Sequence, residues 1–222
     1  MALSHLHHGL QQSWHHNLCA IVLAGGQSSR MGQDKALLEL EGTPLLQRVG
    51  EVALSCSDRV YIVTAWPQRY QHLSIATNCQ FLQEINPQGP LIGFRDGLAY
   101  AVNLASPNRF WVLLLACDLP NLQARVLQAW IAQLTWLPDT VMAYLPRHAA
   151  IDSNKKWDPL CGLYRSDCLF DLQEFIASGG KSFQRWLNHI QVAEIPSIDP
   201  QILFNCNTPA DFDKVVQAST ED

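Results

Sequence analysis

The sequence predicts an α/β fold, a Rossmann-like three-layer sandwich with a mostly parallel, doubly wound sheet and helices on both faces. Through residues 18–135, apolar runs of strand length alternate with segments of helical periodicity, and short connections join them. One apolar run ends in a glycine pair, and a later run ends in an aspartate. Because ligands bind beyond the carboxyl ends of parallel strands, both features point to one binding edge.

The elements follow in order along the chain. Residues 18–24 read LCAIVLA, a continuous apolar run that is typical of a buried parallel strand. Thr43 can cap the next helix, Pro44 suits its first turn, and a later helix begins at Gly89-Pro90. The same patterns predict further strands at 59–65, 79–82, 110–117, 140–145 and 160–164, and further helices at about 122–134, 167–177, 181–188 and 208–218.

The length and composition of the chain limit its possible domain organisation. The chain has 222 residues, which suits one domain, or a domain with a small lobe, and is ample for one buried core. Residues 1–17 hold five of the eight histidines, and we expect them to form a flexible His-rich tail. Residues 18–222 are expected to form a single domain.

Charge and cysteine content exclude several classes of function. The net charge of -5 leaves no broad basic field, so we expect no nucleic-acid partner. No apolar run reaches the roughly 18 residues that span a bilayer, so we expect no membrane partner. The seven cysteines are scattered and include no CxxC pair. They argue against a disulfide framework or a zinc site and favour a reducing, cytoplasmic location.

The segment from Leu23 to Lys35 has the composition of an anion-binding loop. It reads LAGGQSSRMGQDK and matches neither GxxxxGK[ST] nor GxGxxG. Glycine N–H groups can approach phosphate oxygens closely, while hydroxyls add donors and cations add charge. The loop supplies these groups as Gly25, Gly26, Gly32, Ser28, Ser29, Arg30 and Lys35. The alternative is an ordinary strand-to-helix turn with surface charges.

Asp118 directly follows the apolar run 110–117, at the same predicted edge. A carboxylate there can hold Mg²⁺, which takes one or two carboxylates together with phosphate oxygens and water. The alternative is that Asp118 caps the following helix.

Two polar segments later in the chain are also candidates. Asn205 and Asn207 precede Thr208-Pro209, which looks like a helix cap and first turn, so the asparagines can simply form an Asx turn. Lys181 and Ser182 follow a glycine pair and can meet a second phosphate, or simply begin a helix.

These motifs together resemble a known family. The opening segment, with the GTPL run at 42–45, is similar to the LAGG-x-S-x-RMG-x-DK and G-x-P-L signature of the molybdenum cofactor guanylyltransferases, within the nucleotidyltransferase superfamily. Further similarity lies in GPLIG at 89–93, LACDLP at 115–120, PLCGLY at 159–164 and NCNTP at 205–209. The matched segments span about 18–212.

The resemblance implies transfer of GMP from GTP to molybdenum-molybdopterin, with release of pyrophosphate. It also implies a nucleotide-binding half, 18–135, a substrate-side half, 136–222, and possible cofactor-delivery proteins as partners. Catalytic roles fall on Arg30, Lys35 and Asp118, and GTP binding on Leu23, Ala24, Gly25, Gly26, Lys35, Thr64, Glu84 and Asp118. The resemblance further implies that Asp118 binds the metal, Mg²⁺, and that Asn205 and Asn207 make contacts on the molybdopterin side.

Three positions depart from the family's pattern. Thr64 stands where the family often has asparagine, Glu84 where it has aspartate, and Asp158 where a histidine is expected. Thr64 keeps a hydrogen-bonding group, and Glu84 keeps the charge on a longer arm.

The implied chemistry needs no strong general base, because a phosphate monoester is already largely dianionic at neutral pH. Its difficulty is repulsion between two anions, which positioning and charge neutralisation must overcome. Two alternatives remain open. One is a cytidylyltransferase or sugar-phosphate nucleotidyltransferase of the same superfamily, and the other is a nucleotide-binding adaptor without catalysis.

Overall fold

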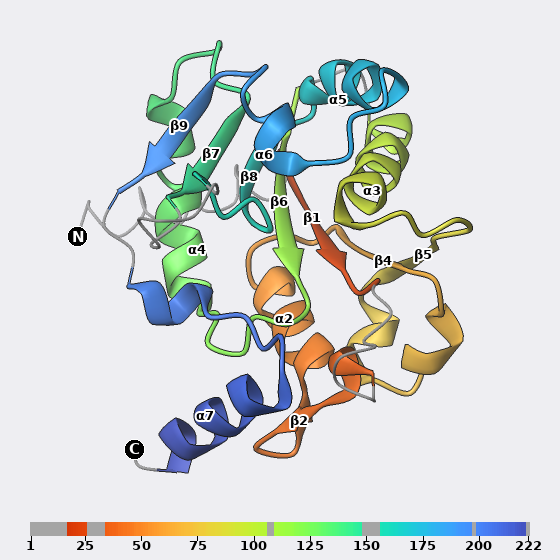
Figure 1. Cartoon of the computed structure of the whole chain (residues 1–222), viewed down its shortest axis with the longest axis vertical. Coiled ribbons are helices and arrows are strands. Elements are labelled where there is room, and N and C mark those ends of the chain that lie inside the picture. Colours follow the sequence, from red (N-terminus) through yellow and green to blue (C-terminus); the bar gives the residue numbers. More distant parts are fainter. Residues whose placement is uncertain (1–16, 26–33, 106–108, 148–155, 197–198, 221–222) are drawn as a thin grey trace, which may run out of the picture.

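A seven-stranded sheet forms the centre of the fold (Figure 1). The computed structural model describes residues 17–25, 34–105, 109–147, 156–196 and 199–220. The strand order is β5-β4-β1-β6-β8-β7-β9. These strands are β1 (Leu18–Leu23), β4 (Val60–Thr64), β5 (Gln80–Gln83), β6 (Trp111–Ala116), β7 (Ala143–Pro146), β8 (Cys161–Arg165) and β9 (Val192–Ile195). Strand β8 is antiparallel to both neighbours and the other pairings are parallel, so the predicted mostly parallel α/β sheet is confirmed.

Helices cover both faces of this sheet. One apolar cluster packs α2 (Leu45–Leu54) and α4 (Ala124–Ile131) against side chains such as Val22, Ile62 and Leu113. A second cluster packs α3 (Pro90–Leu104), α5 (Cys168–Ala177) and α6 (Phe183–Trp186) against the opposite face. Short 3-10 turns link these elements: η1 (Lys35–Leu37), η2 (Pro67–Tyr70), η3 (Ser74–Thr77), η4 (Leu134–Trp136) and η5 (Pro200–Leu203). The predicted three-layer arrangement is therefore confirmed.

The last helix, α7 (Pro209–Thr220), packs away from the sheet. Its Val215 joins a third apolar cluster with residues of the β2 (Glu39–Leu40) and β3 (Thr43–Pro44) hairpin and the start of α2. In Figure 1 α7 lies below the sheet, on the side of β2. The chain that leads into α7 therefore passes the end of the sheet at which β1 ends.

Four sequence expectations need correction. Thr43 does not cap α2, because it lies in β3 and the N–H of Leu45 donates to the Leu38 carbonyl (2.9 Å). The predicted helix 122–134 ends at Ile131 and is followed by η4. The helix predicted at 181–188 is shorter and spans only Phe183–Trp186 (α6). Strand β9 was not predicted, because only its last residue is buried and no apolar alternation marks it.

Of the predicted tail 1–17, only Asn17 lies among the described residues, and its carbonyl accepts the Trp111 N–H (2.8 Å) at the start of the β1–β6 pairing. The division of the domain into two halves stays a prediction. Among the described helices, none combines the length and the apolar character that crossing a bilayer requires.

Candidate functional site

The candidate site lies at the carboxyl ends of β4, β1 and β6. Leu23 pairs with Val63 on one side and with Ala116 on the other, so the three strands end at the same level. The ladder continues one step further: the Ala24 N–H donates to the Val63 carbonyl (2.9 Å), and the Cys117 N–H donates to the Leu23 carbonyl (3.1 Å). The residues that follow these strands are therefore held at defined positions along one edge.

Three pockets line this edge, and we name each by one side chain. The Glu84 pocket, about 350 Å³, lies beyond β1, β4 and β5. The Asp118 pocket, about 200 Å³, shares Leu23, Gly25 and Pro90 with it. The Lys181 pocket, about 270 Å³, shares Pro90 and Leu160 with the Asp118 pocket. Pro90 lines all three pockets, but the Glu84 and Lys181 pockets share no other residue, whereas the Asp118 pocket shares further residues with each of them. The three therefore form one continuous row with the Asp118 pocket in the middle.

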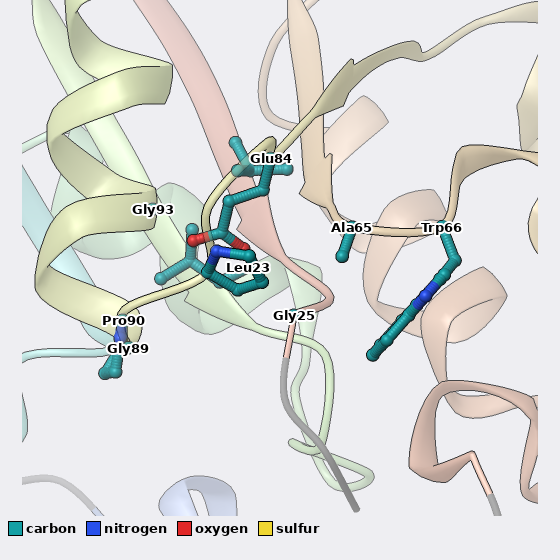
Figure 2. A pocket seen from close by; sticks show the side chains of 10 residues that line it. Leu23, Gly25, Ala65, Trp66, Glu84, Gly89, Pro90 and Gly93 are labelled. Carbon is teal, nitrogen blue, oxygen red and sulfur yellow. The ribbon is translucent and has the colours of Figure 1, made fainter.

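The Glu84 pocket holds a buried carboxylate. Glu84 is only 7% exposed. Burial is the main cause that raises the pKa of its carboxyl above the ordinary value, and the negative charge of Asp96 is the second. A Cβ on Gly25 would come within 2.7 Å of Glu84 Oε2, so the missing side chain at Gly25 makes room for this carboxylate. Figure 2 shows Glu84 near Leu23 and Gly93, with Trp66 across the pocket and Gly25 between them.

Thr64 lies beneath this pocket rather than in its wall. The residue is fully buried, and its hydroxyl oxygen accepts the backbone N–H of Trp66 (3.2 Å). Its carbonyl accepts the Glu84 N–H (2.8 Å). Thr64 thus fixes the two chain segments that carry Trp66 and Glu84, and a direct contact with a ligand stays a prediction.

The Asp118 pocket brings together residues from three distant parts of the chain. Lys35 Nζ lies 3.7 Å from Asp118 Oδ2 and donates to Asn207 Oδ1 (3.1 Å). The Asp118 carbonyl accepts the Cys206 N–H (3.1 Å). Burial raises the pKa of the Asp118 carboxyl, although Lys35 acts in the opposite direction. Burial is thus the larger of the two effects on this carboxylate, which lies beside the Lys35 ammonium in a partly desolvated position.

The alternative roles of these residues do not match the structure. Helix α4 begins at Ala124 with Gln123 as its N-cap, so Asp118 does not cap it. For α7, Thr208 Oγ1 accepts the Asp211 N–H (3.2 Å) and Asp211 accepts the Thr208 N–H (2.9 Å). This reciprocal capping box leaves the Asn207 side chain to meet Lys35.

Sequence reasoning missed the group that positions Lys35. Asp34 Oδ1 accepts the Ala36 N–H (3.1 Å) and so caps η1, the turn that begins with Lys35. Asp34 Oδ2 accepts the Tyr70 hydroxyl (2.8 Å) and a guanidinium N–H of Arg69 (3.4 Å). The DK pair in the opening segment was the available signal, but its partners on η2 lie more than 30 residues away in sequence.

The Lys181 pocket has both polar and aromatic walls. Its lining includes Trp157, Asp158, Lys181, Ser182 and Asn205. Ser182 also caps α6, since its hydroxyl oxygen accepts the Arg185 N–H (3.4 Å). The two predicted asparagines therefore serve different pockets, Asn205 here and Asn207 beside Lys35.

Most of the predicted residues meet at this edge. Leu23, Ala24, Gly25, Lys35 and Asp118 line the Asp118 pocket. Gly26 and Arg30 lie outside the described residues, so their predicted roles stay untested. Among the described residues, no group of three or more His, Cys, Asp or Glu side chains is placed to hold a metal ion. Asp34 is a second carboxylate in the wall of this pocket, but it already accepts hydrogen bonds from Tyr70 and Arg69. The fit to Mg²⁺ therefore rests on Asp118, with phosphate oxygens and water as the remaining ligands.

Comparison with known proteins gives one consistent result. The family model of the MobA-like NTP transferase domain matches residues 20–193. A Nostoc sp. chain named "Probable molybdenum cofactor guanylyltransferase" is 56% identical over 93% of both chains. A Synechococcus elongatus chain with the same name is 42% identical over 88% of this chain and 96% of its own. The crystal structure of molybdopterin-guanine dinucleotide biosynthesis protein A from Archaeoglobus fulgidus has a TM-score of 0.71 at 20% identity, covering 91% of this chain and 99% of that one.

Proposed function

The chain belongs to the MobA-like NTP transferase family, and from that premise we propose that it is a molybdenum cofactor guanylyltransferase. It transfers GMP from GTP to molybdopterin and releases pyrophosphate. The observation that carries this assignment is the continuous row of three pockets, with Lys35 and Asp118 in the middle one. A nucleotide fits such a row with its base at one end and the acceptor at the other.

The Glu84 pocket takes the guanine. The Watson–Crick edge of guanine presents two adjacent donors, N1–H and N2–H₂, and an ionised carboxylate offers two acceptor oxygens. Cytosine and adenine present an acceptor where guanine has N1–H, so the carboxylate disfavours both bases. The approach of Glu84 depends on the glycine at position 25, because a Cβ there would collide with Oε2.

The Asp118 pocket takes the triphosphate and the metal. Lys35 neutralises phosphate oxygens, and we assign the same role to Arg30 in the segment that precedes it. Asp118 holds Mg²⁺, which supplies charge neutralisation to the phosphates when bound. The ladder bonds around Leu23 and Cys117 keep the backbone of this pocket fixed, so little reorganisation accompanies binding.

The Lys181 pocket takes molybdopterin. Lys181 and Ser182 face its terminal phosphate, and Trp157 and Asn205 supply an aromatic wall and an amide for the pterin side. An oxygen of that phosphate forms a bond to the α-phosphorus of GTP, and the bond from this phosphorus to the bridging oxygen breaks as pyrophosphate leaves. The attacking phosphate is already dianionic, so the chain needs to position it rather than remove a proton.

The test is a nucleotide panel with the whole chain. Each of GTP, CTP, ATP and UTP is incubated with Mg²⁺ and molybdopterin, and both pyrophosphate and the dinucleotide product are measured. Turnover with GTP supports the assignment. Turnover with CTP in place of GTP supports the cytidylyltransferase alternative, and binding of nucleotide without any turnover supports the adaptor.

A further inference from the structure

Trp66 forms the wall of the Glu84 pocket that faces the carboxylate. Its indole is half-buried, and Figure 2 shows the ring edge-on, with one face turned toward Gly25 and Glu84. The backbone there is fixed, because the Trp66 N–H donates to Thr64 Oγ1 (3.2 Å) at the end of β4. An aromatic face is thus presented to the space beside the base-reading carboxylate.

Arg69 holds this indole and reaches the next pocket. The guanidinium carbon lies 4.5 Å from the centroid of the Trp66 ring, which is a cation–π distance. The same guanidinium donates to Asp34 Oδ2 (3.4 Å). Asp34 caps the turn that carries Lys35 and lines the Asp118 pocket. One side chain therefore touches both the wall of the Glu84 pocket and the support of Lys35.

We propose that Trp66 stacks on the purine of the bound nucleotide, and that Arg69 is a positioning residue that fixes the indole and links it to the Asp34–Lys35 turn. This inference rests on the proposed function, since it assumes that the Glu84 pocket takes the base. The carboxylate then selects the base by its edge, whereas the indole binds its face, which every purine shares.

Loss of the stacking contact with Trp66 should change KM for GTP but not kcat. Stacking is made equally in the ground state and the transition state, so its loss raises KM for GTP and leaves kcat nearly unchanged. The expected rise for Trp66→Ala is about 5- to 150-fold, the range for one base on one aromatic ring. Trp66→Phe keeps an aromatic face, so its KM should stay within about threefold of wild type.

Arg69 should act on both parts of the nucleotide. Arg69→Ala removes the stack on Trp66 and the bond to Asp34, so it should weaken binding of GTP and of inorganic tripolyphosphate. The expected loss for tripolyphosphate is about two- to fivefold, as for a partly exposed ion pair. Trp66→Ala should leave tripolyphosphate binding near the wild-type level, because the bond from Arg69 to Asp34 remains and the indole lines the pocket of the base.

The experiment measures steady-state kinetics, calorimetric binding of GTP and tripolyphosphate, and quenching of tryptophan fluorescence by GTP. Trp136→Ala is the matched control, because this indole is 84% exposed on η4, outside all three pockets. Thermal unfolding establishes that each variant is folded. Part of the quenching should disappear in Trp66→Phe although its affinity is kept, and a merely structural role would not produce that result.

The outcomes distinguish failure of the Trp66 and Arg69 roles from failure of the proposed function. If Trp66→Ala binds GTP as Trp136→Ala does, or if Trp66→Phe is as impaired as Trp66→Ala, the stacking proposal is overturned. If Arg69→Ala leaves tripolyphosphate binding at the wild-type level, the link to the Lys35 turn is overturned. If the wild-type chain does not bind GTP at all, the proposed function itself fails.

Discussion

Replacing Glu84 by glutamine tests how the site selects its base. The substitution keeps the size of the side chain but replaces one acceptor oxygen with an NH₂ group. Guanine then loses one hydrogen bond to a charged acceptor, worth about 1.5–3 kcal/mol. In its place a donor of the amide faces a donor of the base. We expect kcat/KM for GTP to fall about 10- to 150-fold, and the preference for GTP over ATP to fall with it.

The same change should stabilise the ligand-free protein. Burial raises the pKa of Glu84 in the folded state, so the folded chain holds this proton more tightly than the unfolded chain. Above the folded-state pKa the ionised carboxylate therefore destabilises the fold, and below the unfolded-state pKa this penalty is absent. The Tm of Glu84→Gln should exceed that of wild type at neutral pH, and the difference should shrink as the pH falls toward the ordinary range of a glutamate.

The assays are kinetics with GTP and ATP, and thermal unfolding at several pH values without nucleotide. Asp96→Asn is the control, since Asp96 contributes the second cause of the shift but does not line the pocket. It should leave GTP selectivity unchanged. Wild-type selectivity in Glu84→Gln would refute the base assignment, and a lower Tm at neutral pH would refute the account of the buried charge.

Three further predictions concern the neighbouring residues. Gly25→Ala places a Cβ 2.7 Å from Glu84 Oε2, so this carboxylate must shift and kcat/KM for GTP should fall, and combination with Glu84→Gln should be less than additive because the two changes disturb one contact. Asp118→Asn should lower kcat by about a hundredfold or more with little change in Tm, and wild-type turnover with Mg²⁺ would contradict the metal assignment. Lys35→Ala should weaken GTP and tripolyphosphate binding about 10- to 150-fold, as measured by calorimetry, while guanosine binding stays as in wild type.

The sheet edge was predictable because its signals are local. A buried strand that ends in Gly25 and another that ends beside Asp118 are visible in the sequence, and the geometry of parallel sheets brings such ends together. Helix periodicity placed most of the helices for the same reason. By contrast, Thr43 carries the local mark of a helix cap, but pairing with Leu40 in the hairpin overrides that preference.

The contacts that complete the site are not local. Lys35 and Asn207 are separated by 172 positions, and no spacing rule connects them. From local sequence alone Asn205 and Asn207 could equally form an Asx turn, and it was the resemblance to a family that assigned them to the substrate side. Trp66 and Arg69 belong to no motif, and the route from η2 to Asp34 becomes visible only when the chain is folded.

The position of α7 explains why the C-terminal segment belongs to the site. Cys206 is fully buried in the cluster that α7 forms with the hairpin, and the neighbours on either side of it, Asn205 and Asn207, reach two different pockets. A buried residue between two polar ones fixes both side chains by fixing the backbone, as the bond from Cys206 N–H to the Asp118 carbonyl also does. The backbone of Lys35 is thus held by Asp34 and its partners on η2, and its ammonium group is held by Asn207 from the C-terminal segment. Such support from both sides suits a lysine that must stay at one point while two anions are brought together around it.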